Sequence, residues 1–221
     1  MNARAPRAAA ARLRGLFVLA DDDPRWPHDP VAQARAACAG GAAVVQLRAK
    51  RAGDRDALAW ADAIRALTRR AGVLFFVNDR FDLALAARAD GVHLGQRDLP
   101  PAAIPSTLRE RLLVGRSTHT AAELRAARDE PVDYVAFGPV FGTRSKASEH
   151  EPRGLARLTA AVREAAPRPL IAIGGIDVGN AAAVMSAGAA GIAVISAVAA
   201  ANDPEAATRA LAREISSAAP R

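Results

Sequence analysis

The sequence is poor in cysteine and in aromatic side chains. Its 221 residues include one Cys, one Tyr, two Trp and six Phe. The lone thiol, Cys38, excludes an intramolecular disulfide, and its Ala-rich surroundings predict a small buried apolar group in a protein of the reducing cytoplasm. Nucleic-acid platforms combine basic stretches with aromatic rings. The net charge of +7 is instead carried by Arg residues scattered along the chain, so we expect no nucleic-acid partner.

The sequence also lacks a long, uninterrupted hydrophobic run. The segment 181–201 is uncharged, but glycine and serine residues interrupt it, which favours a buried helix, a turn and a buried strand over a membrane span. The first apolar run, Leu16–Ala20, is too short for a signal segment and continues directly into three Asp residues. We therefore expect no membrane partner, flexible tails at 1–12 and 217–221, and one folded domain over 13–216.

What the sequence has is a regular alternation of short apolar runs with stretches of helical periodicity. The runs do not alternate apolar with polar residues, which is typical of parallel strands buried on both faces. This pattern, in a chain of this length, predicts an α/β fold, a single-domain (β/α)8 TIM barrel, with an open doubly wound sheet as the alternative. The predicted strands are Leu16–Ala20, Ala42–Leu47, Val73–Val77, Gly91–Leu94, Leu112–Gly115, Tyr134–Phe137, Leu170–Ile173 and Gly191–Ile195.

Helix boundary residues fit these strands. Thr120 and Glu123 have the spacing of a capping box, so a helix is expected to begin after the fifth strand. Gly40 and Gly41 are expected to end the first helix, because glycine readily adopts the left-handed conformation that closes helices. The Asn-Asp-Pro-Glu segment at 202–205 predicts the start of the last helix.

Polar residues gather where the predicted strands end, which is where TIM barrels place their reacting groups. Of the 30 basic residues only Lys50 and Lys146 are lysine, and both fall in these segments. A lysine ammonium can follow phosphate oxygens as charge moves, whereas an arginine such as Arg48 holds oxygens in a fixed fork. His119 follows the fifth strand and either orients its loop or takes part in acid–base chemistry. The same segments contain Gln46, Asn78 and Ser117.

Asp79 and Asp98 follow the third and fourth predicted strands. Carboxylates on neighbouring strand ends can hold one Mg²⁺ that takes its other ligands from water and from a substrate phosphate, so we predict Mg²⁺ as the cofactor. Each residue has a structural alternative, because Asp79 could cap a helix beginning near Arg80 and Asp98 a helix beginning at Leu99. Their joint occurrence beside two basic residues favours the metal.

A phosphate site is predicted after the seventh and eighth strands. Gly174 and Gly175 follow one, and Ile195 and Ser196 end the other, at the place where barrels bind phosphate with backbone N–H groups and a helix start. The alternative is that the two glycines only make a tight turn. The loop after the sixth strand adds hydroxyls and an ammonium suited to phosphate oxygens, unless it is simply solvated. Its candidates are Thr143, Ser145 and Lys146.

These segments together resemble the thiamine phosphate synthase family. The most specific is DGVHLGQRDLP at 90–100. The likeness also rests on QLRAK at 46–50, NDR at 78–80, STH at 117–119, GPVF at 138–141 and AIGGI at 172–176. It extends from about Phe17 to Leu211.

The resemblance implies an enzyme that joins 4-amino-2-methyl-5-hydroxymethylpyrimidine pyrophosphate to hydroxyethylthiazole phosphate. Pyrophosphate would leave in a dissociative, Mg²⁺-assisted substitution, and a homo-oligomer is compatible with this function. By this likeness Gln46 would face the pyrimidine, and Asp79 and Asp98 would bind the metal. The pyrophosphate would contact Arg48, Lys50, Asn78, Ser117 and Lys146, and the thiazole phosphate Thr143, Ser145, Gly175, Ile195 and Ser196.

The chain departs from the family's usual pattern at Ala20, Ala49, Gly142 and Ser145, and Arg116 and Arg144 are expected to add charge beside the site. Two other functions stay open. A thiazole tautomerase of the same family would use His119 to move a proton, but proton transfer alone needs no metal and pyrophosphate cradle. A non-catalytic regulator that binds a phosphorylated ligand or a nucleic acid could share the fold.

The position of the second lysine generates the first prediction. Lys146→Ala should lower kcat about 100- to 1000-fold, as does the loss of a preorganised donor that stabilises developing charge. Steady-state kinetics, with folding checked by circular dichroism, measure the effect. An unchanged kcat would make Lys146 a surface residue.

Overall fold

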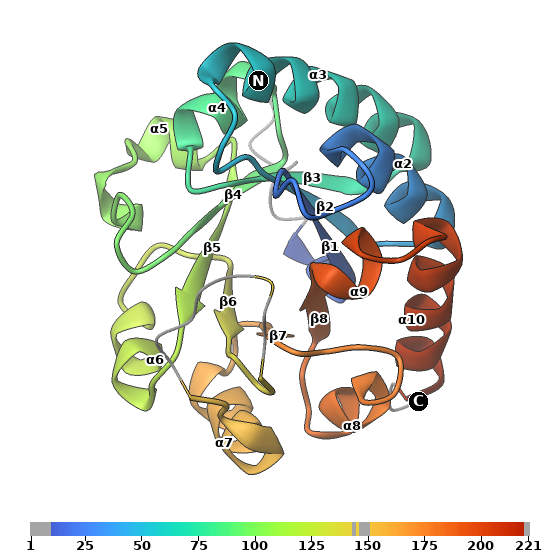
Figure 1. Cartoon of the computed structure of the whole chain (residues 1–221). Helices are drawn as coiled ribbons and strands as arrows, with labels where there is room; N and C mark the ends of the chain where they lie inside the picture. The colour runs from blue at the N-terminus through green and yellow to red at the C-terminus, as the bar shows by residue number, and fades with distance from the viewer. Residues whose placement is uncertain (1–9, 143–144, 146–150, 219–221) are drawn as a thin grey trace.

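The computed structural model describes residues 10–142, 145 and 151–218. Its parallel strands follow one another in chain order around a closed barrel, with the last strand beside the first, and helices form the outer ring (Figure 1). The predicted (β/α)8 barrel is confirmed, and the open doubly wound sheet is wrong. Thr143, Arg144 and Lys146 lie outside the described residues, as do most of the two predicted tails.

The eight predicted strands are all present, with small differences at their ends. They are β1 Gly15–Asp21, β2 Val44–Arg48, β3 Leu74–Asn78, β4 Gly91–Leu94, β5 Leu113–Thr118, β6 Tyr134–Phe137, β7 Leu170–Ile173 and β8 Gly191–Val194. The largest difference is in β5, which continues through Ser117 and Thr118 rather than ending at Gly115. Both residues therefore belong to a rigid strand and not to a loop.

The described helices connect successive strands and cover the barrel. They are α2 Pro30–Gly40, α3 Asp54–Ala71, α4 Phe81–Ala86, α5 Ser106–Arg109, α6 Ala121–Ala127, α7 Gly154–Ala165, α8 Ala181–Ser186, α9 Ser196–Ala199 and α10 Pro204–Ala218, with a short 3-10 turn at Pro101–Ala103. Among the described residues, no helix combines the length and apolar character needed to cross a bilayer.

The predicted helix signals occur at the ends of α6, α2 and α10. The Thr120 hydroxyl accepts a hydrogen bond from the backbone N–H of Glu123, while the Glu123 carboxylate reaches back to the N–H of His119. Gly41 ends α2 with φ of 92°, and the Asp203 carboxylate accepts from the N–H of Ala206 at the start of α10. Residues close in sequence therefore define these helix boundaries through local hydrogen bonds and a left-handed glycine.

Cys38 lies on α2 and packs, half-buried, against the core between the sheet and the helices. Burial raises the pKa of its thiol to about 11, so the sulfur stays protonated at neutral pH. Cys38 therefore packs as a small apolar group, as predicted, but it is half-buried rather than buried.

A second core fills the inside of the barrel and lies below the carboxyl ends of the strands. Tyr134 is buried there between Phe17 and Phe76, with ring centroids 5.7 and 5.8 Å away. Its hydroxyl lies 2.8 Å from Nδ1 of His93, whose Nε2 lies 2.8 Å from Oγ of Ser117. This column of side chains connects the hydrophobic interior to the carboxyl ends of the strands.

The Tyr134 ring fits only because β5 has a glycine beneath it. A Cβ on Gly115 would lie 2.2 Å from Cζ of Tyr134. Gly115→Ala should therefore destabilise the protein by about 1 to 3 kcal/mol, as overpacking does, and should also displace Ser117. Urea unfolding measures the loss.

Gly53→Ala is the matched control, because nothing lies within 4 Å of the Cβ that it would add. Equal stabilities for the two variants would show that the barrel interior can absorb the added methyl group.

Candidate active site

The carboxyl ends of the strands enclose a central pocket of about 450 Å³ in the barrel axis. Its polar side chains come from four neighbouring strands, and its floor is apolar, with Tyr134 at the bottom. The polar residues are Gln46, Arg48, Asn78, His93 and Ser117. Four of these are predicted site residues, so the fold brings together side chains that lie up to 71 positions apart in the sequence, from Gln46 to Ser117.

His93 is the fifth polar residue of the central pocket, and sequence reasoning placed it in the core with its polar atoms satisfied. Both ring nitrogens do have partners, as expected, since they contact Tyr134 and Ser117. The ring nevertheless forms part of the pocket wall. It therefore supports the orientation of Ser117 from below, which the packing interpretation missed.

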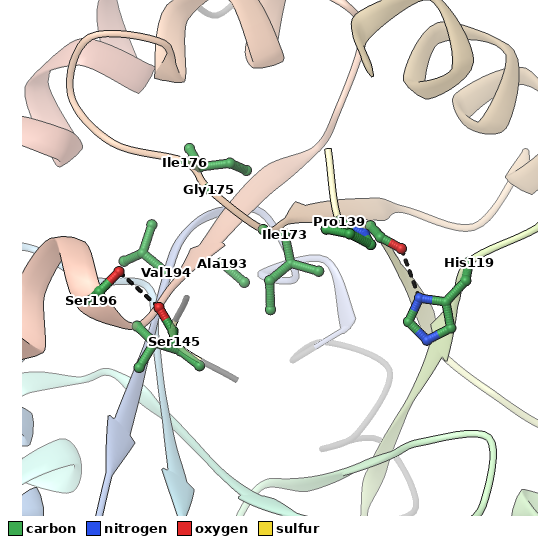
Figure 2. Close-up of a pocket in the computed structure, with 12 residues that line it drawn as sticks. His119, Pro139, Ser145, Ile173, Gly175, Ile176, Ala193, Val194 and Ser196 are labelled. Atoms are coloured by element: carbon green, nitrogen blue, oxygen red, sulfur yellow. Dashed lines mark hydrogen bonds between the residues drawn. The ribbon is translucent and has the colours of Figure 1, made fainter. Parts of the chain in front are cut away.

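A second pocket of about 480 Å³, here called the glycine pocket, opens beside the first (Figure 2). It contains Ser145 and Ser196, whose hydroxyls are 2.8 Å apart, together with Gly174, Gly175 and Ile195. The predicted candidates after the seventh and eighth strands thus lie around one cavity. Ile173 and Ala193 line both pockets, so the two cavities adjoin each other there.

The two glycines of this pocket are required by backbone geometry. Gly174 and Gly175 have φ angles of 101° and 64°, which are left-handed conformations that favour glycine. A Cβ on Gly174 would lie 2.5 Å from Cβ of Pro139, and one on Gly175 would lie 2.4 Å from the carbonyl oxygen of Gly142. The turn is therefore tight, and it also forms one wall of the cavity.

His119 lines the glycine pocket on the side away from Ser145 and Ser196 (Figure 2). Its Nδ1 lies 2.7 Å from the carbonyl oxygen of Gly138, so the ring joins the end of β5 to the loop after β6. Of the two roles expected for His119, loop orientation and acid–base chemistry, this contact is of the kind that orients a loop.

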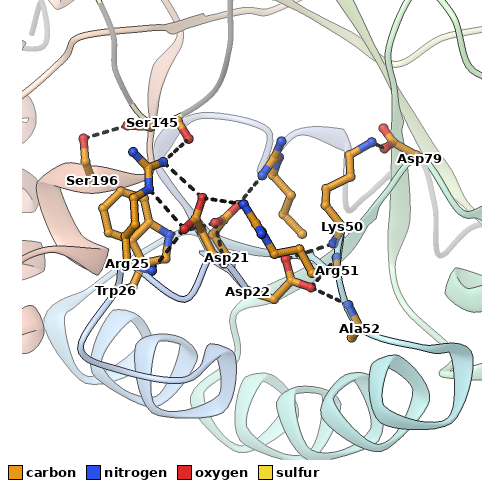
Figure 3. Close-up of polar contacts among 12 residues, drawn as sticks. Asp21, Asp22, Arg25, Trp26, Lys50, Arg51, Ala52, Asp79, Ser145 and Ser196 are labelled. Atoms are coloured by element: carbon orange, nitrogen blue, oxygen red, sulfur yellow. Dashed lines mark hydrogen bonds and ion pairs between the residues drawn. The ribbon is translucent and has the colours of Figure 1, made fainter.

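Asp79 and Asp98 lie together at the rim with Lys50. The Lys50 ammonium forms an ion pair with the Asp79 carboxylate (Figure 3), and Asp79 shares a hydrogen bond with Asp98. Asp98 also accepts the backbone N–H of Gly95 at 2.6 Å. Neither carboxylate caps a helix: the N-cap residue of α4 is Arg80, and the turn at Pro101–Ala103 follows Pro100 without a side-chain cap. The capping alternatives are therefore wrong.

The electrostatics of this pair depend on burial and on proximity. Burial raises the pKa of Asp79 to about 6, the hydrogen bond with Asp98 adds to that increase, and Lys50 opposes it. Burial also disfavours ionisation of Asp98, but the contacts with Asp79, the Gly95 N–H and Lys50 outweigh it and lower the pKa of Asp98. Two close carboxylates therefore compete for one balancing positive charge.

The carboxylate pair fits a divalent cation that is only partly held by protein. Over the described ranges, no cluster of three or more His, Cys, Asp or Glu side chains could enclose a metal. A cation bound by Asp79 and Asp98 would need further oxygens from water or phosphate, which is how Mg²⁺ commonly binds.

Arg116 does not reach the site, so the expectation that it adds charge there is wrong. It is 6% exposed, and its guanidinium donates to the carbonyl oxygen of Gly95 and approaches Glu130. Because β5 continues to Thr118, Arg116 alternates with the inward-facing Gly115 and Ser117 and points out of the barrel.

Sequence reasoning missed the group at the end of β1. Asp21 forms an ion pair with Arg48, and Asp22 accepts hydrogen bonds from the backbone that carries Lys50 (Figure 3). The run of three aspartates that begins at Asp21 was the available signal, but it served only to exclude a signal segment.

Comparisons with known proteins give the family of the chain. Residues 16–198 match the family model described as thiamine monophosphate synthase. The chain is 54% identical over 198 residues to a thiamine-phosphate synthase of Anaeromyxobacter dehalogenans, covering 89% of this chain and 86% of that protein. It is 49% identical over 203 residues to a thiamine-phosphate synthase of Chlorobium phaeovibrioides, covering 90% and 93% respectively.

A solved structure with a similar fold is the thiamine phosphate pyrophosphorylase from Pyrococcus furiosus. The TM-score is 0.82 at 36% sequence identity, over 95% of this chain and 98% of that one. Family model, sequence relatives and structure all confirm the resemblance seen in the motifs. The chain therefore belongs to the thiamine monophosphate synthase family.

Proposed function

We propose that the chain condenses a hydroxymethylpyrimidine pyrophosphate, bound in the central pocket, with a hydroxyethylthiazole phosphate, bound in the glycine pocket. The observation that carries this proposal is that the two pockets adjoin each other at Ile173 and Ala193, which line both. Two molecules bound in adjoining pockets would have their reacting atoms next to each other. Such positioning converts a bimolecular encounter into a reaction within one complex.

The central pocket matches the pyrimidine pyrophosphate in shape and charge. Gln46, 4% exposed on β2, offers an amide to the edge of the pyrimidine, and Tyr134 and Ile171 provide an apolar surface for the ring. Arg48 and Asn78 lie at the ends of the neighbouring strands β2 and β3, where the pyrophosphate would emerge from the pocket. Ser117 would complete this set from β5.

The glycine pocket matches a smaller phosphate. The hydroxyls of Ser145 and Ser196 and the backbone of Gly175 and Ile195 surround one end of it. Thiazole phosphate would place its phosphate there and its ring against Ile173. From that position the ring nitrogen would face the methylene carbon of the pyrimidine where the two pockets adjoin.

In the proposed reaction, the bond between the methylene carbon and the pyrophosphate oxygen breaks, and its electron pair leaves with pyrophosphate. Positive charge then spreads over the methylene carbon and the aminopyrimidine ring. The lone pair of the thiazole nitrogen forms the new carbon–nitrogen bond, and the product keeps the positive charge on the thiazolium. Arg48, Lys50, Asn78 and Ser117 act by stabilising the departing anion, so no protein nucleophile is needed.

Asp79 and Asp98 would hold Mg²⁺ in place of the proton that they share, because two adjacent carboxyl groups, once ionised, supply the oxygen ligands and the negative charge that this cation prefers. When bound, Mg²⁺ would supply positive charge that offsets the negative charge on the departing pyrophosphate. Lys50, which balances Asp79 in this structure, lies close enough to turn toward the same anion.

The site favours synthesis over the two alternative functions. A thiazole tautomerase would need an acid–base residue at the thiazole, but not Arg48 and Lys50 beside a carboxylate pair. A non-catalytic regulator would not need two adjoining pockets.

The carboxylate pair generates a prediction about metal dependence. Purified protein mixed with both precursors should form thiamine phosphate and release pyrophosphate with Mg²⁺, and should lose this activity in excess chelator. Asp79→Asn should raise the Mg²⁺ concentration for half-maximal rate by roughly tenfold or more, as loss of a metal-site group does.

Asp82→Asn is the control for this substitution, because that carboxylate lies nearby on α4 and pairs with Arg80 outside both pockets. Full activity in chelator would contradict the metal assignment. Turnover of a thiazole phosphate alone, without condensation, would favour the tautomerase.

The glycine pocket generates a prediction about substrate selectivity. Gly175→Ala would force the loop after β6 outward, because the added Cβ meets Gly142 and Phe141. The KM for thiazole phosphate should rise about tenfold or more, in line with strain of about 1 to 3 kcal/mol, with little change in the KM for the pyrimidine substrate.

Gly72→Ala controls for backbone strain, since Gly72 has φ of 68° at the end of α3 but no atom within 4 Å of an added Cβ. An equal rise in both KM values of Gly175→Ala would place the thiazole phosphate elsewhere.

A further inference from the structure

The proposed function gives no task to the carboxylates at the end of β1. Asp21 is the last residue of that strand, and its side chain has no solvent exposure. Arg48 is its register partner on β2, so the two residues lie side by side at the barrel rim. A charge that is fully removed from water is costly unless it is paired, which makes the contacts of Asp21 informative.

Both oxygens of the Asp21 carboxylate are engaged. Oδ2 accepts a hydrogen bond from Nη1 of Arg48 at 2.5 Å. Oδ1 accepts from the indole N–H of Trp26 at 2.7 Å and from the backbone N–H of Asp23 at 3.0 Å. The carboxylate therefore cannot rotate without breaking a hydrogen bond, and it holds the Arg48 guanidinium from one fixed direction.

The backbone of Asp21 is also locked. The amide of Gln33, a fully buried residue of α2, accepts from the N–H of Asp21 and donates to its carbonyl oxygen, each at 2.9 Å. Arg48 thus rests on a carboxylate that is fixed to both the sheet and a helix. The same guanidinium lines the central pocket.

Asp22 fixes the chain that follows Arg48. Its carboxylate accepts three successive backbone N–H groups, those of Lys50, Arg51 and Ala52, at 2.9, 2.7 and 2.9 Å. The side chain of Lys50 extends from this held loop to Asp79 (Figure 3). Two neighbouring carboxylates at the end of β1 therefore hold Arg48, the last residue of β2, and the backbone of Lys50 in the loop that follows.

We propose that Asp21 and Asp22 are positioning residues for the reaction, which set Arg48 and Lys50 in the orientation that pyrophosphate requires before substrate arrives. A buried ion pair is weak evidence for stability, because an apolar pair of the same volume often stabilises a fold as well or better. A fixed guanidinium, in contrast, needs no ordering at the moment of reaction. This inference rests on the proposed function, since it takes Arg48 to contact the pyrophosphate.

A double-mutant cycle tests the inference. Asp21→Asn keeps the shape of the side chain but removes its charge, so kcat should fall by about 10- to 100-fold, as small misplacements of catalytic groups do. In an Arg48→Ala background, Asp21→Asn should produce almost no further fall, because its effect acts through the missing guanidinium. An equal fall in both backgrounds would overturn the inference and leave Asp21 with a structural role alone.

Two further variants keep the result decisive. Trp26→Phe preserves an aromatic ring but removes the N–H that donates to Oδ1 of Asp21. We expect a smaller fall in kcat than for Asp21→Asn, and no fall in the Arg48→Ala background. This variant tests the same contact if Asp21→Asn folds poorly. Asp22→Asn should raise the Kd for inorganic pyrophosphate with Mg²⁺ several-fold. An unchanged Kd would overturn the positioning role of Asp22.

Asp29→Ala is the matched control for loss of stability. Asp29 is exposed on the same loop and caps α2 by accepting from the N–H of Ala32 at 2.8 Å, so its loss should lower the melting temperature without changing kcat. A fall in kcat for Asp29→Ala as large as that for Asp21→Asn would overturn the inference. If Arg48→Ala itself leaves kcat and pyrophosphate affinity unchanged, the proposed contact between Arg48 and pyrophosphate is wrong. That result differs from equal effects of Asp21→Asn in both backgrounds, which would overturn only the positioning role of Asp21.

Discussion

The site depends on opposite charges held close together at one end of a closed parallel sheet. Arg48 is paired with the buried Asp21, and Lys50 with Asp79, which lies beside Asp98. Arg48 and Lys50 are therefore both paired with carboxylates rather than surrounded by water alone. Lys50 carries one positive charge beside two acidic groups, Asp79 and Asp98, so this side of the site has an excess of negative charge. An anion with several oxygens and a divalent cation can each replace part of these contacts. The free protein therefore already has the charge arrangement that the proposed pyrophosphate complex needs.

Closure of the barrel explains how so few residues form this arrangement. All strands run in the same direction, so their carboxyl ends meet in one ring and neighbouring strands deliver neighbouring functional groups. Inside that ring, Tyr134, His93 and Ser117 connect the apolar interior to the rim through successive contacts of 2.8 Å. Two pockets adjoin at Ile173 and Ala193, which is the geometry expected for a reaction between two different molecules.

Much of this could be predicted from the sequence, because each strand is buried on both faces and leaves an apolar run, and because polar residues follow those runs. Two kinds of information were absent. The strand β5 continues through polar residues that have no apolar signature, so Arg116 was placed at the rim although it faces outward. The pairing of Asp21 with Arg48 depends on the register of β1 against β2, which a linear sequence does not display. Local caps and metal ligands also use the same residue types, so only the contacts of Asp79 and Asp98 could separate the two roles.

A crystal structure of the protein with inorganic pyrophosphate, Mg²⁺ and thiazole phosphate tests the central claim most directly. The account predicts pyrophosphate against Arg48, Asn78 and Ser117, with Asp21 still holding the far side of Arg48, and thiazole phosphate between Ser145, Gly175 and Ser196. Pyrophosphate bound away from the carboxyl ends of β2, β3 and β5, or both anions bound in one pocket, would contradict it.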